Sequence, residues 1–320
     1  MKRTEQSITR AIQATQRICR LPAIPTHNWA TDLADALADL SPALSVGVLI
    51  AHIDPQTQSV SPICAAVGHV HNTQSAADAT HQSLYLQDRL HRLTSLGCDL
   101  PDEAFDRGLI APLFVLHPHW PSTPIGRIFA NSHLQSPILM IVPFAHDHPG
   151  YVLILTLAFE KDAHASKPTD QTHATLESTS DIVDTLAALF PLIKTKAHLA
   201  LNRVTDHKAW LTDREQEILD HLILGHSVRV IAERLRRSAH TVHDHVKNLH
   251  KKLDASSRGE LIAKALGHQA PDTKCQTTEP IILTGETSLA ELKPIREQAS
   301  KPKLHARPLN PAAEQRHHAE

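Results

Sequence analysis

Residues 211–261 read LTDREQEILDHLILGHSVRVIAERLRRSAHTVHDHVKNLHKKLDASSRGEL, and this stretch decides the fold of the C-terminal part of the chain. Apolar residues recur in it at helical spacing in four short segments, each opened by a hydroxyl side chain suited to cap a helix: Thr212, Ser227, Ser238 and Ser257. Glutamates three residues further on, Glu215 and Glu260, predict capping boxes at the first and fourth segments. Helices this short do not bury a core singly, so we expect four helices that pack on one another.

The third segment, residues 239–252, has a polar side and follows a tight turn. The polar residues outside its apolar stripe are His240, Thr241, His243, Asp244, Lys247, Asn248, His250 and Lys251. Residues 208–268 hold eleven Lys or Arg against eight Asp or Glu, a net charge of +3 in a chain whose total is −2. Local positive charge neutralises DNA phosphates, and a polar helix behind a tight turn can enter a major groove. The same residues could also form an ordinary solvated helix face.

The spacing of several short motifs in this stretch resembles the LuxR-type (FixJ-type) helix-turn-helix family. The motifs are Leu211-Thr212-x-Arg214-Glu215-x-Glu217-Ile218-Leu219, Gly225-x-Ser227, Ile231-Ala232-x-x-Leu235, Ser238-x-x-Thr241-Val242-x-x-His245-Val246 and Lys252-Leu253-x-x-x-Ser257-Arg258. The resemblance implies a four-helix DNA-binding domain over residues 207–270, with a recognition helix at about 239–252. It also implies a homodimer on DNA, held by the fourth helix.

Two departures from the family pattern bear on what DNA the domain would read. His243 and Asp244 stand where the family usually has a lysine and its neighbour, and Val228-Arg229-Val230 replaces a polar run. These changes leave the fold expectation intact and the operator sequence open. The candidate DNA-contacting residues are His240, Thr241, His243, Asp244, Lys247, Asn248, Lys251 and Arg258.

Residues 1–200 alternate helical and strand-like patterns. Apolar runs predict strands at 46–53, 60–67, 137–144 and 151–159, the last two as a hairpin, between helices at 8–18, 29–40, 84–93 and 176–201. We expect Ile8, Ile12 and Ile18 to mark the buried side of the first helix, and Pro191 to kink or break the last. The order resembles a GAF-like sensory domain, or equally a PAS-like one. Either family implies an antiparallel sheet with a pocket for an unidentified small-molecule effector. Alternatively, these residues only dimerise or position the DNA-binding block.

Metal, cofactor and membrane signals are weak. Four His-x-His pairs (His69/His71, His117/His119, His146/His148 and His243/His245) fall in predicted loops or in the DNA helix, and no Cys or carboxylate completes a metal set. We therefore expect no metal and no cofactor. The thiols of Cys19, Cys64, Cys98 and Cys275 form no CxxC motif, and no apolar run approaches about 18 residues. A cytoplasmic protein with reduced thiols and no membrane span follows as the expectation.

The sequence shows no catalytic triad, carboxylate pair or nucleotide-binding loop, so we expect no enzyme and no catalytic residues. The predicted architecture has three parts. The first is an α+β sensor domain at 1–200, an antiparallel sheet with flanking helices. The second is an all-α helix-turn-helix domain at 207–270, and the third is a proline-containing, disordered tail at 271–320. We interpret the chain as a sequence-specific regulator of transcription gated by its sensor domain. The alternatives are an enzyme in residues 1–200 localised to DNA, or a non-specific nucleoid-type protein.

Overall fold

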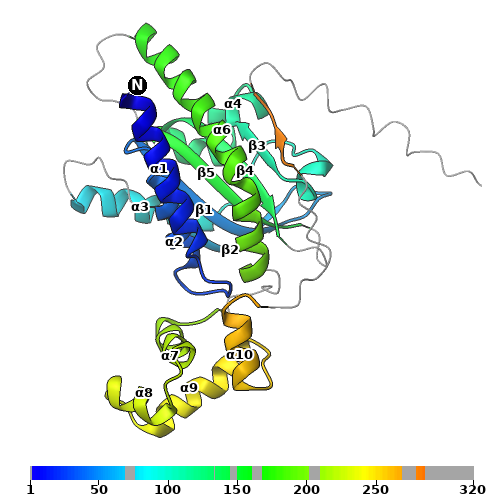
Figure 1. The fold of residues 1–320 in the computed structure, drawn as a ribbon. Coiled ribbons are helices and arrows are strands. Elements are labelled where there is room, and N and C mark those ends of the chain that lie inside the picture. Colours follow the sequence, from blue (N-terminus) through cyan, green and yellow to red (C-terminus); the bar gives the residue numbers. More distant parts are fainter. Residues whose placement is uncertain are drawn as a thin grey trace, which may run out of the picture.

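The computed structural model describes residues 2–68, 76–132, 134–144, 150–160, 168–201, 210–268 and 279–284. Residues 2–201 form an N-terminal unit, a sheet with helices on both faces, and residues 210–268 form a C-terminal unit of four helices at one end of it (Figure 1). Within the described residues, no helix is both long and apolar enough to cross a membrane.

The sheet has six strands in the order β2-β1-β5-β4-β3-β6: β1 (Leu44–Ile53), β2 (Val60–Val67), β3 (Leu109–Pro112), β4 (Leu134–Pro143), β5 (Tyr151–Glu160) and β6 (Ile281–Ile282). The four predicted strands are confirmed, and β4 and β5 pair antiparallel as the expected hairpin, with Ile141 opposite Ile154. The expected antiparallel pairing is found between β2, β1, β5, β4 and β3, and one edge of the sheet differs from it. There β6 lies parallel to β3, which makes the sheet mixed.

Helices cover both faces of this sheet. On one face lie α1 (Lys2–Cys19), α2 (Trp29–Ala38) and α6 (Pro168–Leu201). On the other lie α3 (Ala76–His91), η1 (Asp102–Phe105), α4 (Leu113–Leu116), η2 (Trp120–Ser122) and α5 (Pro124–Ala130). Alternate strand residues feed the two cores: Val48 and Ile50 of β1 face the first, and Leu49 and Ala51 the second.

Two details of the helices differ from the sequence expectation. Ile18 is buried as predicted, but Ile8 and Ile12 are exposed, because α1 turns Ala14 rather than these residues toward α2 and α6. Helix α6 runs through Pro191 without a break. Pro191 is exposed and Ala187, four residues earlier, is only half-buried, so solvent can satisfy the carbonyl that loses its helical partner.

Part of the predicted tail is ordered against the sheet. The Ile281 N–H donates to the Gly108 carbonyl at 3.0 Å, and the Leu283 N–H to the Ile110 carbonyl at 3.0 Å. A disordered tail is therefore the wrong expectation for residues 279–284, while the rest of the tail lies outside the described residues. A run of three apolar residues is too short to predict a strand, and its partner lies far away in the sequence.

The C-terminal unit has the four predicted helices: α7 (Asp213–Ile223), α8 (Val228–Arg234), α9 (Ala239–Lys252) and α10 (Arg258–Ala265). They surround one small core, in which Leu219, Ile231, Val242, Leu249 and Leu261 are buried. Each helix contributes to this core, so the fold of the unit depends on all four.

Candidate nucleic-acid interface

All four helices of the C-terminal unit start at a side-chain cap. The capping box of Thr212 and Glu215 is confirmed, since the Thr212 N–H donates to the Glu215 carboxylate at 2.9 Å and the Glu215 N–H to the Thr212 hydroxyl at 3.3 Å. The hydroxyls of Ser227, Ser238 and Ser257 each accept from the backbone N–H three residues further on.

The second predicted capping box is wrong in one half. Ser257 does accept from the Glu260 N–H, but the Glu260 carboxylate turns to Ser256, accepting from its hydroxyl at 2.6 Å and its N–H at 2.8 Å. The hydrogen bond from the Ser256 hydroxyl and one from Lys264 lower the pKa of Glu260 to about 2. The sequence places two serines side by side, and only the backbone geometry decides which of them the carboxylate reaches.

Left-handed backbone residues lie in the turns that follow α7 and α8. Gly225, with φ at +83°, ends α7, and the His226 N–H returns to the His221 carbonyl at 3.1 Å. Arg236, with φ at +51°, lies in the short turn between α8 and α9, where the Arg237 N–H reaches back to the Ala232 carbonyl. This turn aims the start of α9 outward.

A buried ion pair joins the end of α9 to the start of α7. The Lys252 ammonium lies 2.7 Å from the Glu215 carboxylate and donates to the Trp210 carbonyl at 2.7 Å. The side chains of Glu215 and Lys252 are 5% and 22% exposed. Burial alone would raise the pKa of Glu215, but hydrogen bonds from Lys252 and Thr212 outweigh it and hold the pKa below its usual value. Sequence reasoning missed Lys252, whose partner lies 37 residues away.

The structure brings seven of the eight candidate residues together on one exposed side of α9. They are His240, Thr241, His243, Asp244, Lys247, Asn248 and Lys251, and they lie opposite the buried Val242 and Leu249. The His240 ring lies 3.5 Å from the Asp244 carboxylate, so the acid has a neighbour within the helix. The Thr241 and Ser238 hydroxyls are 2.8 Å apart, which ties Thr241 to the start of the helix.

The eighth candidate, Arg258, lies apart from this surface. Its guanidinium donates to the carbonyls of His226 at 2.8 Å and Leu222 at 3.2 Å, at the C-terminal end of α7. A cation there compensates the helix dipole and the free carbonyls. The structure thus gives Arg258 a contact within the fold, and its predicted DNA contact has no support from its position. Exposed Arg236 and Arg237, in the turn before α9, are cations that the sequence prediction left out.

The predicted histidine pairs offer little for a metal. His117 and His119 lie with their ring centroids 6.4 Å apart, and His243 and His245 belong to α9. The pairs His69/His71 and His146/His148 lie outside the described residues. Over the ranges that the structure describes, no three His, Cys, Asp or Glu side chains gather as metal ligands. Burial raises the pKa of Cys64 to about 11 and that of Cys98 to about 12, so both are thiols at neutral pH.

The C-terminal unit is docked on the N-terminal unit through a backbone bridge that the sequence did not predict. The Leu211 N–H donates to the Pro25 carbonyl at 2.9 Å, and the His27 N–H donates to the Leu211 carbonyl at 3.0 Å. Ile24, from the same loop, is buried in the core of the C-terminal unit. The connector at residues 202–209 lies outside the described residues.

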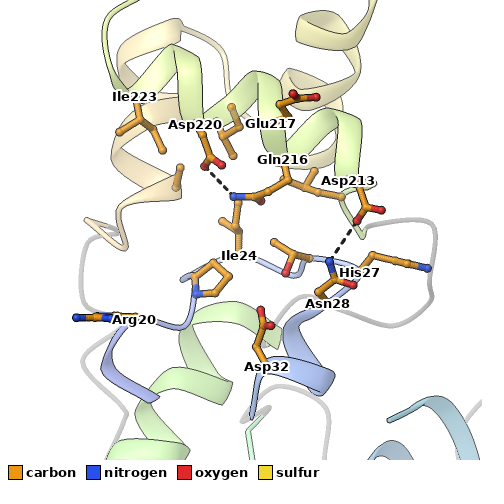
Figure 2. A pocket seen from close by; sticks show the side chains of 15 residues that line it. Arg20, Ile24, His27, Asn28, Asp32, Asp213, Gln216, Glu217, Asp220 and Ile223 are labelled. Atoms are coloured by element: carbon orange, nitrogen blue, oxygen red, sulfur yellow. Dashed lines mark hydrogen bonds between the residues drawn. The ribbon is translucent and has the colours of Figure 1, made fainter. Parts of the chain in front are cut away.

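A hollow of about 510 Å³ opens beside this bridge (Figure 2). Its lower wall carries Arg20 and Asp32, and α7 contributes Asp213, Glu217 and Asp220 from above. Burial raises the pKa of both Asp32 and Asp220. The two units therefore face each other across this hollow with carboxylates on both sides, and the Asn28 amide donates to Asp213 at 3.3 Å.

A four-helix unit that presents an exposed polar helix after a tight turn has the arrangement of a helix-turn-helix domain. Residues 209–265 match the family described as "Bacterial regulatory proteins, luxR family". This part of the chain is therefore a LuxR-family domain, the DNA-binding domain of a transcription regulator, and the resemblance inferred from the sequence is confirmed. No curated protein matches the chain.

Solved structures give weak overall similarity. The structure of SdiA in complex with octanoyl-rac-glycerol is 16% identical, with a TM-score of 0.27 over 81% of this chain and 94% of that chain. Another structure of SdiA, from Escherichia coli, is 16% identical, with a TM-score of 0.21 over 70% of this chain and 83% of that chain. The phage VqmA–DPO complex is 12% identical, with a TM-score of 0.19 over 73% of this chain and 88% of that chain. Similarity at this level leaves the assignment to the family match alone.

Proposed function

We propose that the chain is a sequence-specific transcription regulator whose helix α9 reads the major groove of double-stranded DNA. The observation that carries this proposal is the exposed polar side of α9 within a LuxR-family domain. Lys247 and Lys251 are suited to phosphate contacts, which set the register. Thr241 and Asn248, on the same side, are suited to base edges. The family match favours this function over an enzyme.

The exposure of α9 bears on how the N-terminal unit would gate DNA binding. With the C-terminal unit docked through Leu211, the candidate DNA-contacting side of α9 remains exposed. A simple masking switch would require the docked arrangement to cover the recognition helix. The docked arrangement leaves this helix exposed. We propose instead that the N-terminal unit acts by fixing the orientation of the C-terminal unit.

Orientation matters most in a dimer, which we propose for the DNA-bound state. One recognition helix reads only a few base pairs, so useful specificity needs two half-sites about 10 base pairs apart. Exposed Leu266 and half-buried Ile262, at the end of α10, support the fourth helix as the contact between two copies. The alternative role of these residues is to close the core of their own unit.

An unidentified small-molecule effector is the proposed input to the N-terminal unit. A second hollow, of about 560 Å³, lies between α3 and β2 and is lined by half-buried Cys64 and by Leu84, Asp88 and His91. Pockets of this size accept small organic ligands, and the mixed lining would suit one with both apolar and polar groups. If no effector binds, these residues serve only to position the C-terminal unit.

The phosphate role of α9 can be tested on the full-length chain with Lys247→Ala. Losing one phosphate contact should weaken binding to every duplex alike and reduce the slope of log affinity against log salt by about one. Arg92→Ala is the matched control, because it removes an exposed cation just after α3 in the N-terminal unit and should leave the slope unchanged. An unaltered slope for Lys247→Ala would reject the phosphate role.

A further inference from the structure

The β3 edge of the sheet in the N-terminal unit is covered by a segment that follows the C-terminal unit in the chain. Residues 279–284 lie along β3, with β6 beside it and far from α10 in Figure 1. Besides the two backbone bonds of β6, the Arg107 guanidinium donates to the Glu279 carbonyl at 3.2 Å. An edge strand presents unpaired backbone groups that an added strand can satisfy.

Side chains of this segment alternate in a way that matches its place on the sheet. Ile281 is 7% exposed and Leu283 is 1% exposed, and both join the core on the α3 and α5 side. Ile282, between them, is 40% exposed. The segment is therefore seated by two apolar anchors as well as by its backbone.

Helix α6 and the returning segment at 279–284 both contact one turn of the N-terminal unit, residues 106–108. Helix α6, which leads into the C-terminal unit, contacts this turn through Lys194, whose ammonium donates to the Asp106 carbonyl at 3.4 Å. The ring of Phe190 packs against Gly108, whose φ of +96° and lack of a β-carbon allow the close approach. The carbonyl of Gly108 then accepts the Ile281 N–H. In the order of the chain, the C-terminal unit (residues 210–268) therefore lies between two segments that both contact this turn.

We propose that residues 279–284 are a strap whose docking on the edge of β3 holds the C-terminal unit against the loop of residues 21–28. A unit attached at both ends has less freedom to move away than one attached at a single end. Gly267, at the end of the C-terminal unit, also lies against Ala23, so its exit as well as its entry meets this loop. By docking on β3, the strap thus limits how far the C-terminal unit, and α9 with it, can turn relative to the N-terminal unit.

Hydrogen exchange of the full-length protein tests the strap at a site remote from it. The double variant Ile281→Asp/Leu283→Asp should release the strap, and Ile282→Asp is the matched control at the exposed position. Release should speed exchange of the His27 and Leu211 amides, which bond across the two units, by about tenfold or more, while the control behaves as wild type. Amides of β4 and β5 report whether the sheet itself remains folded.

Two chain lengths keep the test decisive if the double variant disturbs the sheet. A chain that ends at residue 284 retains the strap and should match the full-length protein, whereas one that ends at 278 should match the double variant. Fast exchange at Ile281 and Leu283 in the wild type would overturn the proposal. So would an unchanged Leu211 amide after the strap is released, because the segment would then only cover a sheet edge.

The inference deepens the proposed regulation and rests on it in one respect, that the unit held in place is the DNA-binding one. Because the exchange experiment contains no DNA, its failure is distinct from a failure of DNA binding. A strap confirmed by exchange in a protein that binds no DNA would leave the conformational proposal standing and remove the proposed function.

Discussion

The helices of the two units are held in place in different ways. In the C-terminal unit α7 to α10 all begin with a side-chain cap, and apart from Ile24 their core is formed by residues within 211–265. In the N-terminal unit α2, η1 and α4 begin without a side-chain cap, and packing on a sheet of distant strands holds them. The C-terminal unit is therefore encoded mainly by local contacts, whereas the N-terminal unit depends on long-range ones.

The largest expected effect is a loss of stability in the N-terminal unit, which depends on long-range contacts. Phe190→Ala removes a fully buried ring from the core between α6 and the sheet, which should cost about 3–5 kcal/mol. Denaturant unfolding followed by probes in each unit should show the N-terminal transition move far more than the C-terminal one. Equal shifts in both transitions would contradict the contrast, because the two units would then unfold as one.

A smaller loss is expected from the long-range ion pair of Glu215 with Lys252 in the C-terminal unit. Glu215→Ala leaves the Lys252 ammonium largely buried without its carboxylate, which should lower the free energy of unfolding by about 3 kcal/mol. Glu217→Ala is the control, since it removes an exposed pair with Arg214 and should cost less than about 1 kcal/mol. Similar losses for both variants would show that burial does not set the strength of the pair.

The local part of the encoding is tested by the cap of the recognition helix. Ser238→Ala deprives the Thr241 N–H of its acceptor and should cost about 1 kcal/mol, measured by thermal unfolding. Ser238→Gly should cost only a few tenths, because water then reaches the free N–H. If the alanine variant is as stable as the wild type, the cap contributes nothing and the local account of this unit fails at α9.

What the sequence could predict follows the same division. The caps at Thr212, Ser227 and Ser238 and the helix end at Gly225 depend on neighbours within a few residues, so a local pattern reveals them. In the N-terminal unit the longer strands were predictable from runs of apolar residues. The four-residue β3 was not, because a short strand buried on both faces shows no alternation.

Contacts between distant residues account for what the sequence did not predict. The pair of Lys252 with Glu215, the bridge of Leu211 to the loop at 25–27 and the seating of β6 on β3 depend on the finished fold. The candidate DNA-contacting side of α9 could be predicted because a single helix carries it. Arg258 could not be placed, because its carbonyl partners lie at the end of another helix.

The central claim is that the exposed side of α9 reads a DNA sequence, and selection from a random pool of duplexes tests it most directly. The full-length protein should enrich a motif of two half-sites about 10 base pairs apart, and Asn248→Ala should change the preferred bases within each half-site. Binding without enrichment of any motif would contradict the claim and favour a non-specific nucleoid-type protein. If the wild type and Asn248→Ala enrich the same motif, Asn248 does not contact the bases that define it.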